Sequence, residues 1–171
     1  LASPLRDVYK RQDLVVNTQP LTEIKNLLQH DIDTQTNTNG MTESSVNEFN
    51  KKLNAAKEQI KQIEHVISNH PTVSQVNDTK AQTERIKSQL DSARSSLTVD
   101  RQPLINAKNE LQNSIDRNPD LQGMTEQSKN IFTQKLEQAR NEIQKVNGVL
   151  NGNPNVNDIN TNKEHALEIK E

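Results

Sequence analysis

The sequence contains no cysteine and no tryptophan, and aromatic residues make up only 2% of its 171 positions. Without cysteine the chain has no disulfide, no thiol nucleophile and no thiolate metal site, although this leaves its cellular compartment open. A formal net charge of −2 offers no field that favours nucleic acid or an anionic membrane. No apolar run approaches the roughly 20 residues that span a bilayer. Hydrophobic residues make up 30% of the chain, so their spacing decides whether a core can form.

Patterns typical of catalysis or metal binding are missing as well. The many carboxylates are accompanied by no His-x-Glu, Ser-x-x-Lys or glycine-rich phosphate loop. The sequence therefore predicts a protein that is not an enzyme, with no catalytic residue, no cofactor, no metal and no small-molecule substrate. It identifies no ligand-binding residue. Helix-surface positions in solvent are the better interpretation of all four histidines, which do not pair at helical spacing: His30, His65, His70 and His165.

What the chain does contain is a long internal repeat. A shift of 83 positions, which takes Gln19 onto Gln102, aligns residues 13–88 with residues 96–171 without a gap, and 29 of the 76 pairs are identical. The phrase GMTESS at Gly40 returns as GMTEQS at Gly123. A register this long indicates a tandem duplication.

The repeat register suggests the domain boundaries. Residues 13–16 match the end of a repeat, so we expect them to close a preceding one. We expect a first complete repeat at 17–98 and a second at 99–171, truncated in its third helix. The stretch DVYKRQ (residues 7–12) can be encoded by a transposon end used in preparing sequencing libraries. We therefore interpret residues 1–12 as a non-native, disordered segment, with a native tail as the alternative.

Each repeat is predicted to begin its helices with recognisable caps. Asn17 and its mate Asp100 can accept a backbone N–H at the start of the first helix, where a proline follows in the first turn. Thr42 and Thr125 are cap candidates for the second helix, each followed by a glutamate that suits the helix dipole. A capping box, Thr72-x-x-Gln75, opens the third helix, and its mate Asn155-x-x-Asp158 is a weaker version. The four glycines fall at or near helix ends: Gly40, Gly123, Gly148 and Gly152.

Apolar residues recur at helical spacing within all three segments. The first runs over about residues 18–33. The stripe of the second includes Phe49, whose mate is Phe132, and we expect both to anchor a core, so that Phe132→Ala costs roughly 3–5 kcal/mol. The third carries Thr79 and Thr83 on its stripe, which predicts looser packing there. Further apolar positions of the second and third stripes are Val46, Leu53, Ala56, Ile60, Ile63, Ile67, Val76, Ile86, Leu90, Ala93 and Leu97.

Three amphipathic helices with short connections predict an antiparallel bundle. The fold class expected is all-α, with tandem antiparallel three-helix bundles arranged as an elongated rod that is monomeric. Since the second repeat lacks mates for Leu90, Ala93 and Leu97, we expect it to be the less stable of the two.

The combination of helical pattern, Thr-x-x-Ser entry and 83-residue period resembles the FIVAR module, a three-helix repeat of Gram-positive surface proteins. The entries read Thr42-Glu43-Ser44-Ser45 and Thr125-Glu126-Gln127-Ser128, and methionine precedes each where the module usually has an aromatic residue. The resemblance covers nearly all of residues 13–171, and the Asn-, Gln- and Thr-rich style is most similar to giant staphylococcal members.

This resemblance implies an extracellular protein of the bacterial cell surface or cell wall. It implies a structural stalk and adhesin that binds host extracellular matrix, for example fibronectin, weakly and at many points. Two alternatives stay open from the residues: a module that binds a serum protein such as albumin or immunoglobulin, and an intracellular helical scaffold. No nucleic-acid partner is expected, because lysine and glutamate alternate along the helices.

Overall fold

The computed structural model describes residues 15–170, and the secondary structure of that part consists of six α-helices and no extended strand. The all-α prediction is confirmed. The proposed non-native segment, residues 1–12, lies outside the described residues, as do positions 13 and 14 of the expected preceding repeat. The helices are α2 (Gln19–Asp33), α3 (Glu43–Ser68), α4 (Val73–Ser95), α5 (Gln102–Ile115), α6 (Glu126–Asn151) and α7 (Val156–Lys170).

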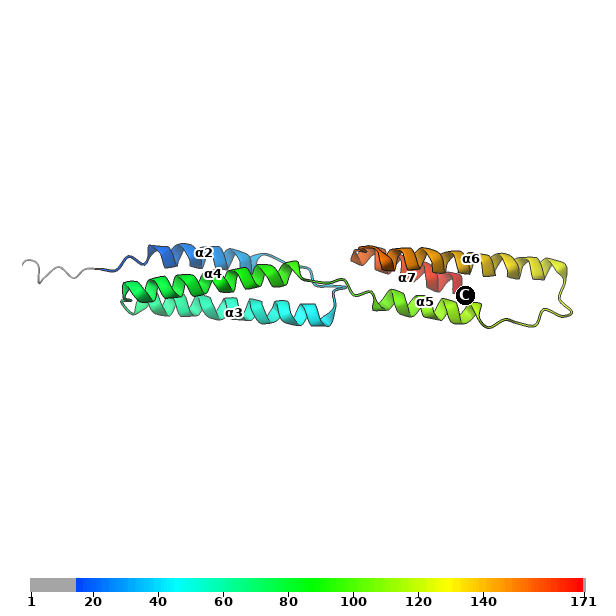
Figure 1. Ribbon diagram of the computed structural model, residues 1–171, viewed down its shortest axis with the longest axis horizontal. Helices are drawn as coiled ribbons and strands as arrows, with labels where there is room; N and C mark the ends of the chain where they lie inside the picture. Colours follow the sequence, from blue (N-terminus) through cyan, green and yellow to red (C-terminus); the bar gives the residue numbers. More distant parts are fainter. Residues whose placement is uncertain (1–14, 171) are drawn as a thin grey trace, which may run out of the picture. The chain divides into compact units, whose positions relative to one another are not determined.

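The contacts divide the described chain into two compact units. Unit 1 comprises residues 15–37 and 43–97, and unit 2 comprises residues 38–42 and 98–170. In unit 1, helices α2, α3 and α4 each pack against the other two, and in unit 2 the same holds for α5, α6 and α7 (Figure 1). The middle helix of each unit runs opposite to its two neighbours. The loop 38–42, which joins α2 to α3, thus belongs to unit 2 by its contacts.

The helix starts follow the cap chemistry expected from the sequence. Asn17 Oδ1 accepts from the Gln19 amide at 2.9 Å, and Asp100 does the same for Gln102. Thr125 accepts from the Ser128 amide at 3.2 Å. These bonds satisfy N–H groups that have no partner within the helix, which is why short polar residues occupy the positions.

Both third helices begin with a complete capping box. The Thr72 hydroxyl accepts from the Gln75 amide, and the Gln75 side chain accepts from the Thr72 amide at 2.8 Å. Asn155 and Asp158 exchange the same pair of bonds, each at 2.9 Å. The expectation that the second box is weaker is therefore not met in its geometry, because aspartate is long enough to reach back to the amide of Asn155.

The interior of unit 1 consists of two apolar clusters, and the polar side chains of Gln59, Thr79 and Thr83 are buried as well. Phe49 is 4% exposed and packs in the same cluster as Leu28 and Leu90. Midway along the unit, Thr83 is fully buried, and its hydroxyl accepts from the Gln59 side-chain amide at 2.8 Å while donating to the Thr79 carbonyl. A buried hydrogen bond thus accommodates the polar side chain at a position for which the sequence predicted looser packing.

The core of unit 2 differs from that of unit 1 in the position of its phenylalanine. Leu104, Leu111 and Val146 form the centre of its core. Phe132, however, is only half-buried and lies outside that cluster, so the expectation that it anchors a core as Phe49 does is wrong. In unit 1 the equivalent phenylalanine is covered by the C-terminal half of α4, whereas the last described residue of α7 is Lys170.

Candidate functional site

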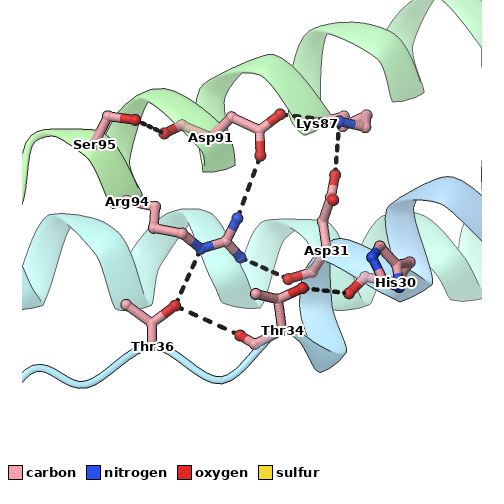
Figure 2. A network of polar contacts seen from close by, with 8 residues as sticks. All are labelled: His30, Asp31, Thr34, Thr36, Lys87, Asp91, Arg94 and Ser95. Atoms are coloured by element: carbon pink, nitrogen blue, oxygen red, sulfur yellow. Dashed lines mark hydrogen bonds and ion pairs between the residues drawn. The ribbon is translucent and has the colours of Figure 1, made fainter.

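The most connected group of polar side chains lies on unit 1, where the end of α4 passes the end of α2 (Figure 2). Arg94 donates from Nη2 to the Asp31 carbonyl oxygen at 2.6 Å and from Nε to Thr36 Oγ1 at 3.0 Å. A third bond runs from Nη1 to Asp91 Oδ1 at 3.3 Å. The guanidinium has donors in several directions, so one side chain binds the last turn of α2 and the loop after it.

Lys87, which lies on α4 seven residues before Arg94, belongs to the same network. Its Nζ is 2.8 Å from Asp31 Oδ2 and 2.9 Å from Asp91 Oδ2. The hydrogen bond to the Asp31 carboxylate raises the pKa of Lys87 above its ordinary value, and the bond to Asp91 adds to this, because both favour the charged ammonium. Asp31 is the most enclosed of the four charged side chains, with 15% of its side chain exposed.

The network also closes one end of the unit 1 core. The guanidinium carbon of Arg94 lies 5.8 Å from the centre of the Phe49 ring, a cation–π distance. Two carboxylates face two cations, so the charges balance and leave no field for an ionic ligand. The group contains no base beside a nucleophile. Its arrangement therefore serves to hold α2, α4 and the following loop together.

In unit 2, Arg101 binds the C-terminal end of α6. Arg101 donates from Nη1 to the Leu150 carbonyl at 2.6 Å and from Nη2 to the Gly152 carbonyl at 3.1 Å. These are carbonyls at the end of α6, which lack partners within the helix. The repeat mate of Arg101 is Thr18, so the two repeats place their arginines at different helix ends.

The histidines are all exposed: His30 near the end of α2, His65 in α3, His70 after α3 and His165 in α7. Within residues 15–170, no group of three or more histidine or acidic side chains is arranged to hold a metal ion. None of the helices in this part is both long and apolar enough to cross a bilayer.

One apolar cleft of about 230 Å³ opens in unit 2. It lies where the half-buried Phe132 ring is left uncovered, between α5, α6 and the end of α7. Its polar lining is limited to Ser114, Lys135 and Lys170, which offer no catalytic set. The apolar lining residues are Leu111, Ile115, Phe132, Leu136, Ala139 and Ile169.

Comparison with known proteins identifies the family to which this chain belongs. The FIVAR domain matches it twice, over residues 24–91 and 107–170. The chain belongs to the FIVAR family, and the two matches fall one in each repeat.

Relatives at 46% identity cover 92% of the chain. They include "Extracellular matrix-binding protein EbhB" from Staphylococcus aureus strain Newman and "Extracellular matrix-binding protein ebh" from strain NCTC 8325 / PS 47. EbhB of strain N315 is equally similar. The chain spans only about 2% of the length of the first two and 4% of the third. No solved structure matches the chain.

Proposed function

We propose that the chain is a segment of a repetitive staphylococcal cell-surface protein that acts as a structural stalk and as an adhesin for host extracellular matrix. The observation that carries this proposal is the 46% identity, over 92% of the chain, to proteins named for matrix binding. The relatives are not named as enzymes, and the polar network of unit 1 and the cleft of unit 2 offer no catalytic arrangement. The location that fits is the bacterial cell surface or cell wall.

The architecture proposed for this role is a tandem array of antiparallel three-helix bundles, with repeats at 17–98 and 99–171, extended as a monomeric rod. The mutual packing of three helices within each unit supports it. So does the 83-residue period, since arrays of similar repeats extend by adding units. A long array also multiplies weak contacts, and avidity then raises binding by about 10²–10⁴ over one contact.

Binding to immobilised matrix proteins tests the adhesin role. The chain is measured on fibronectin, with collagen and albumin surfaces alongside, first as a monomer and then displayed on a tetravalent carrier. We expect weak binding of the monomer to fibronectin and much tighter binding of the displayed form, because several sites engage at once. The control is an unrelated three-helix protein of similar charge on the same carrier.

Each outcome of this measurement has a clear meaning. Absence of fibronectin binding by the displayed form would refute the fibronectin adhesin and leave the stalk alone. Selective binding to albumin would instead favour the serum-protein module. That module needs an exposed apolar patch on one pair of helices. The large apolar side chains that are exposed in the described chain are Val15, Leu27 and Val73 in unit 1 and Met124 and Ile131 in unit 2.

A further inference from the structure

Asparagine precedes glycine at three places in the chain: residues 39–40, 147–148 and 151–152. Asparagine is chemically labile in such a pair, because the main-chain nitrogen of the next residue can attack its side-chain amide carbon. Glycine permits this attack best, since it has no side chain to hinder the approach and the widest choice of backbone angles. The three pairs therefore share one chemistry, and the fold around each pair decides how readily it reacts.

The pairs at 147–148 and 151–152 lie within α6 and at its end. Residues 147–148 are inside the helix, where each amide donates to the carbonyl four residues earlier. The Asn147 side chain is engaged as well, since its Oδ1 accepts from Lys108 Nζ at 3.2 Å. At the helix end, the Gly152 amide donates to a carbonyl of the last turn at 3.2 Å. In both pairs a hydrogen bond thus holds the nitrogen that has to attack.

The pair at 39–40 is exposed and lies in a turn. The Met41 amide closes this turn by donating to the Thr38 carbonyl at 3.2 Å, and Gly40 has a φ of +75° that suits glycine. Within residues 15–170, the Gly40 amide donates to no main-chain carbonyl. The nitrogen that follows Asn39 is therefore more available for attack than the nitrogens at 148 and 152.

The second repeat contains the same turn with a different side chain. Gln122 stands at the position that corresponds to Asn39 in the 83-residue register. Gly123 has a φ of +76°, and the Met124 amide donates to the Leu121 carbonyl at 3.2 Å, so the two turns agree in backbone. Attack on glutamine closes a six-membered ring instead of a five-membered one, and the additional rotatable bond makes this closure slower. The chain thus contains a matched and less reactive control.

We propose that Asn39 is a site of spontaneous deamidation, and that it is the first of the three pairs to react in the folded chain. The Gly40 nitrogen bonds to Asn39 Cγ, the bond from Cγ to the side-chain nitrogen breaks, and this nitrogen leaves as ammonia with the Gly40 amide proton. The product is a five-membered succinimide. Water then opens the ring: cleavage at Cγ gives aspartate, and cleavage at the main-chain carbonyl carbon gives isoaspartate. Water is the only co-reactant, and nothing is oxidised or reduced.

The surroundings of this turn make the two products unequal. The Gly40 carbonyl accepts from the Asp100 amide at 2.8 Å, and the Thr42 amide donates to the Thr98 carbonyl at 2.7 Å. Gly40 also lies close to α7, since a Cβ at this position would be 2.5 Å from Cγ1 of Val156. A short pairing of main-chain atoms thereby holds the loop 38–42 in unit 2.

Isoaspartate disturbs this pairing, whereas aspartate does not. In isoaspartate the main chain passes through the former side-chain carbons, so one methylene is added between residue 39 and Gly40. Hydrogen bonds between paired segments depend on their register, and Val156 leaves little space for an additional atom. The isoaspartate form should therefore lose the bonds made by Gly40 and Thr42. The aspartate form keeps the original main chain and both bonds.

Ageing of the purified chain tests the site, and matrix binding does not enter the measurement. The chain is incubated in mildly alkaline buffer, both folded and in denaturing urea. Peptide mass spectrometry follows the conversion of each asparagine, and enzymatic methylation detects isoaspartate. In the folded chain, Asn39 should convert first, while residues 147–148 and 151–152 keep their amides. In urea the three pairs should convert at similar rates, because the helix no longer protects two of them.

Two variants use the matched turn. Asn39→Gln should abolish conversion in the first turn, and Gln122→Asn should introduce it in the second. The proposal is overturned if Asn39 keeps its amide over the time in which the denatured chain converts. It is overturned equally if the two pairs of α6 convert as fast as Asn39 in the folded chain, or if Gln122→Asn does not convert.

Hydrogen exchange tests the consequence for the loop. The isoaspartate form, separated from the aged chain by chromatography, should lose protection at the Thr42 and Asp100 amides. Asn39→Asp, which represents the other product, should keep this protection. Equal protection of the two forms would contradict the disturbed pairing.

Discussion

The two repeats share one pattern of helices and caps, yet they finish their cores in different ways. In unit 1 the end of α4 brings Leu90 and Ala93 over Phe49, and Arg94 lies on the ring. In unit 2 the equivalent Phe132 faces an open cleft of about 230 Å³. The difference shows that a matching sequence position does not ensure a matching environment, because the burial of a side chain depends on which residues lie opposite it.

The units also differ at their central polar position. Gln59 and Thr83 form a buried hydrogen bond in unit 1, whereas their mates are Glu142 and Ala166. Glu142 is 7% exposed, its Oε1 has no hydrogen-bond partner in the described chain, and Lys145 approaches it only to 3.8 Å. A buried carboxylate without close partners is destabilising. Both comparisons therefore predict that unit 2 is the weaker unit.

The largest effect is expected from removing the phenylalanine of each unit in turn. Phe49→Ala should lower the unfolding free energy of unit 1 by about 3–5 kcal/mol, because the ring is buried and its loss leaves a cavity. Phe132→Ala should cost about half as much, because its ring is already partly in solvent. Denaturant unfolding followed by NMR signals of each unit measures both. Equal losses in the two units would contradict the difference in burial.

The next largest contrast in unfolding free energy is expected between Gly40, which precedes α3, and Gly123, which precedes α6. Both have positive φ, so alanine costs about 1 kcal/mol of backbone strain at either position. Gly40→Ala adds a clash with Val156, which costs about 1–3 kcal/mol more, while Gly123→Ala meets nothing. The unfolding free energies of the two variants, compared in one titration series, test the contact between Gly40 and Val156. A cost at Gly123 as large as that at Gly40 would argue against it.

Changes at the central polar pair should destabilise unit 1 and stabilise unit 2. Thr83→Ala leaves the buried Gln59 amide without its acceptor and should cost unit 1 about 1–3 kcal/mol. Glu142→Gln with Ala166→Thr should rebuild that bond in unit 2, with a coupling of about 0.5–3 kcal/mol in a double-mutant cycle. Additive single effects would show that glutamine and threonine do not meet in unit 2.

The smallest effect concerns pH and the polar network. The pKa of Lys87 is raised by its hydrogen bond to Asp31 and then by that to Asp91. A raised pKa contributes stability that is fully present below the unfolded-state pKa of about 10.4 and is lost as the pH rises through the folded-state pKa. Lys87 is 30% exposed, so the contribution is about 1 kcal/mol or less.

This loss at high pH should disappear in a variant that cannot titrate. The unfolding free energy of unit 1 is compared between the unaltered chain and Lys87→Gln from neutral pH to about pH 11, and the difference should shrink as the pH rises. Lys170→Gln, which removes an exposed ion pair with Glu110, is the matched control in unit 2. A difference for Lys87→Gln that stays constant with pH would rule out the proposed linkage.

Local chemistry made much of this structure predictable. Helical spacing located the elements, and Asn17, Thr125 and the Thr72 capping box act as their residue types suggest, because caps involve neighbours two or three positions away. The bond between Arg94 and Asp31 joins residues 63 positions apart, and that between Gln59 and Thr83 joins two helices. No short pattern encodes such pairs.

The loop around Gly40 was predictable only in part. The repeated glycine before Met41 and Met124 signals a turn in the left-handed conformation, and this signal is visible in the sequence. The contact of Gly40 with Val156, by contrast, depends on tertiary structure, since residues so distant along the chain meet only in the folded unit. The open cleft at Phe132 escaped prediction for the same reason.

Native-state hydrogen exchange tests the predicted difference in stability between the two units most directly. Amides at the buried positions Ala56, Ile63 and Leu90 should exchange at least about tenfold more slowly than those at Ala139 and Val146, a difference of about 1.4 kcal/mol. Equal protection in both units, or slower exchange in unit 2, would contradict the account.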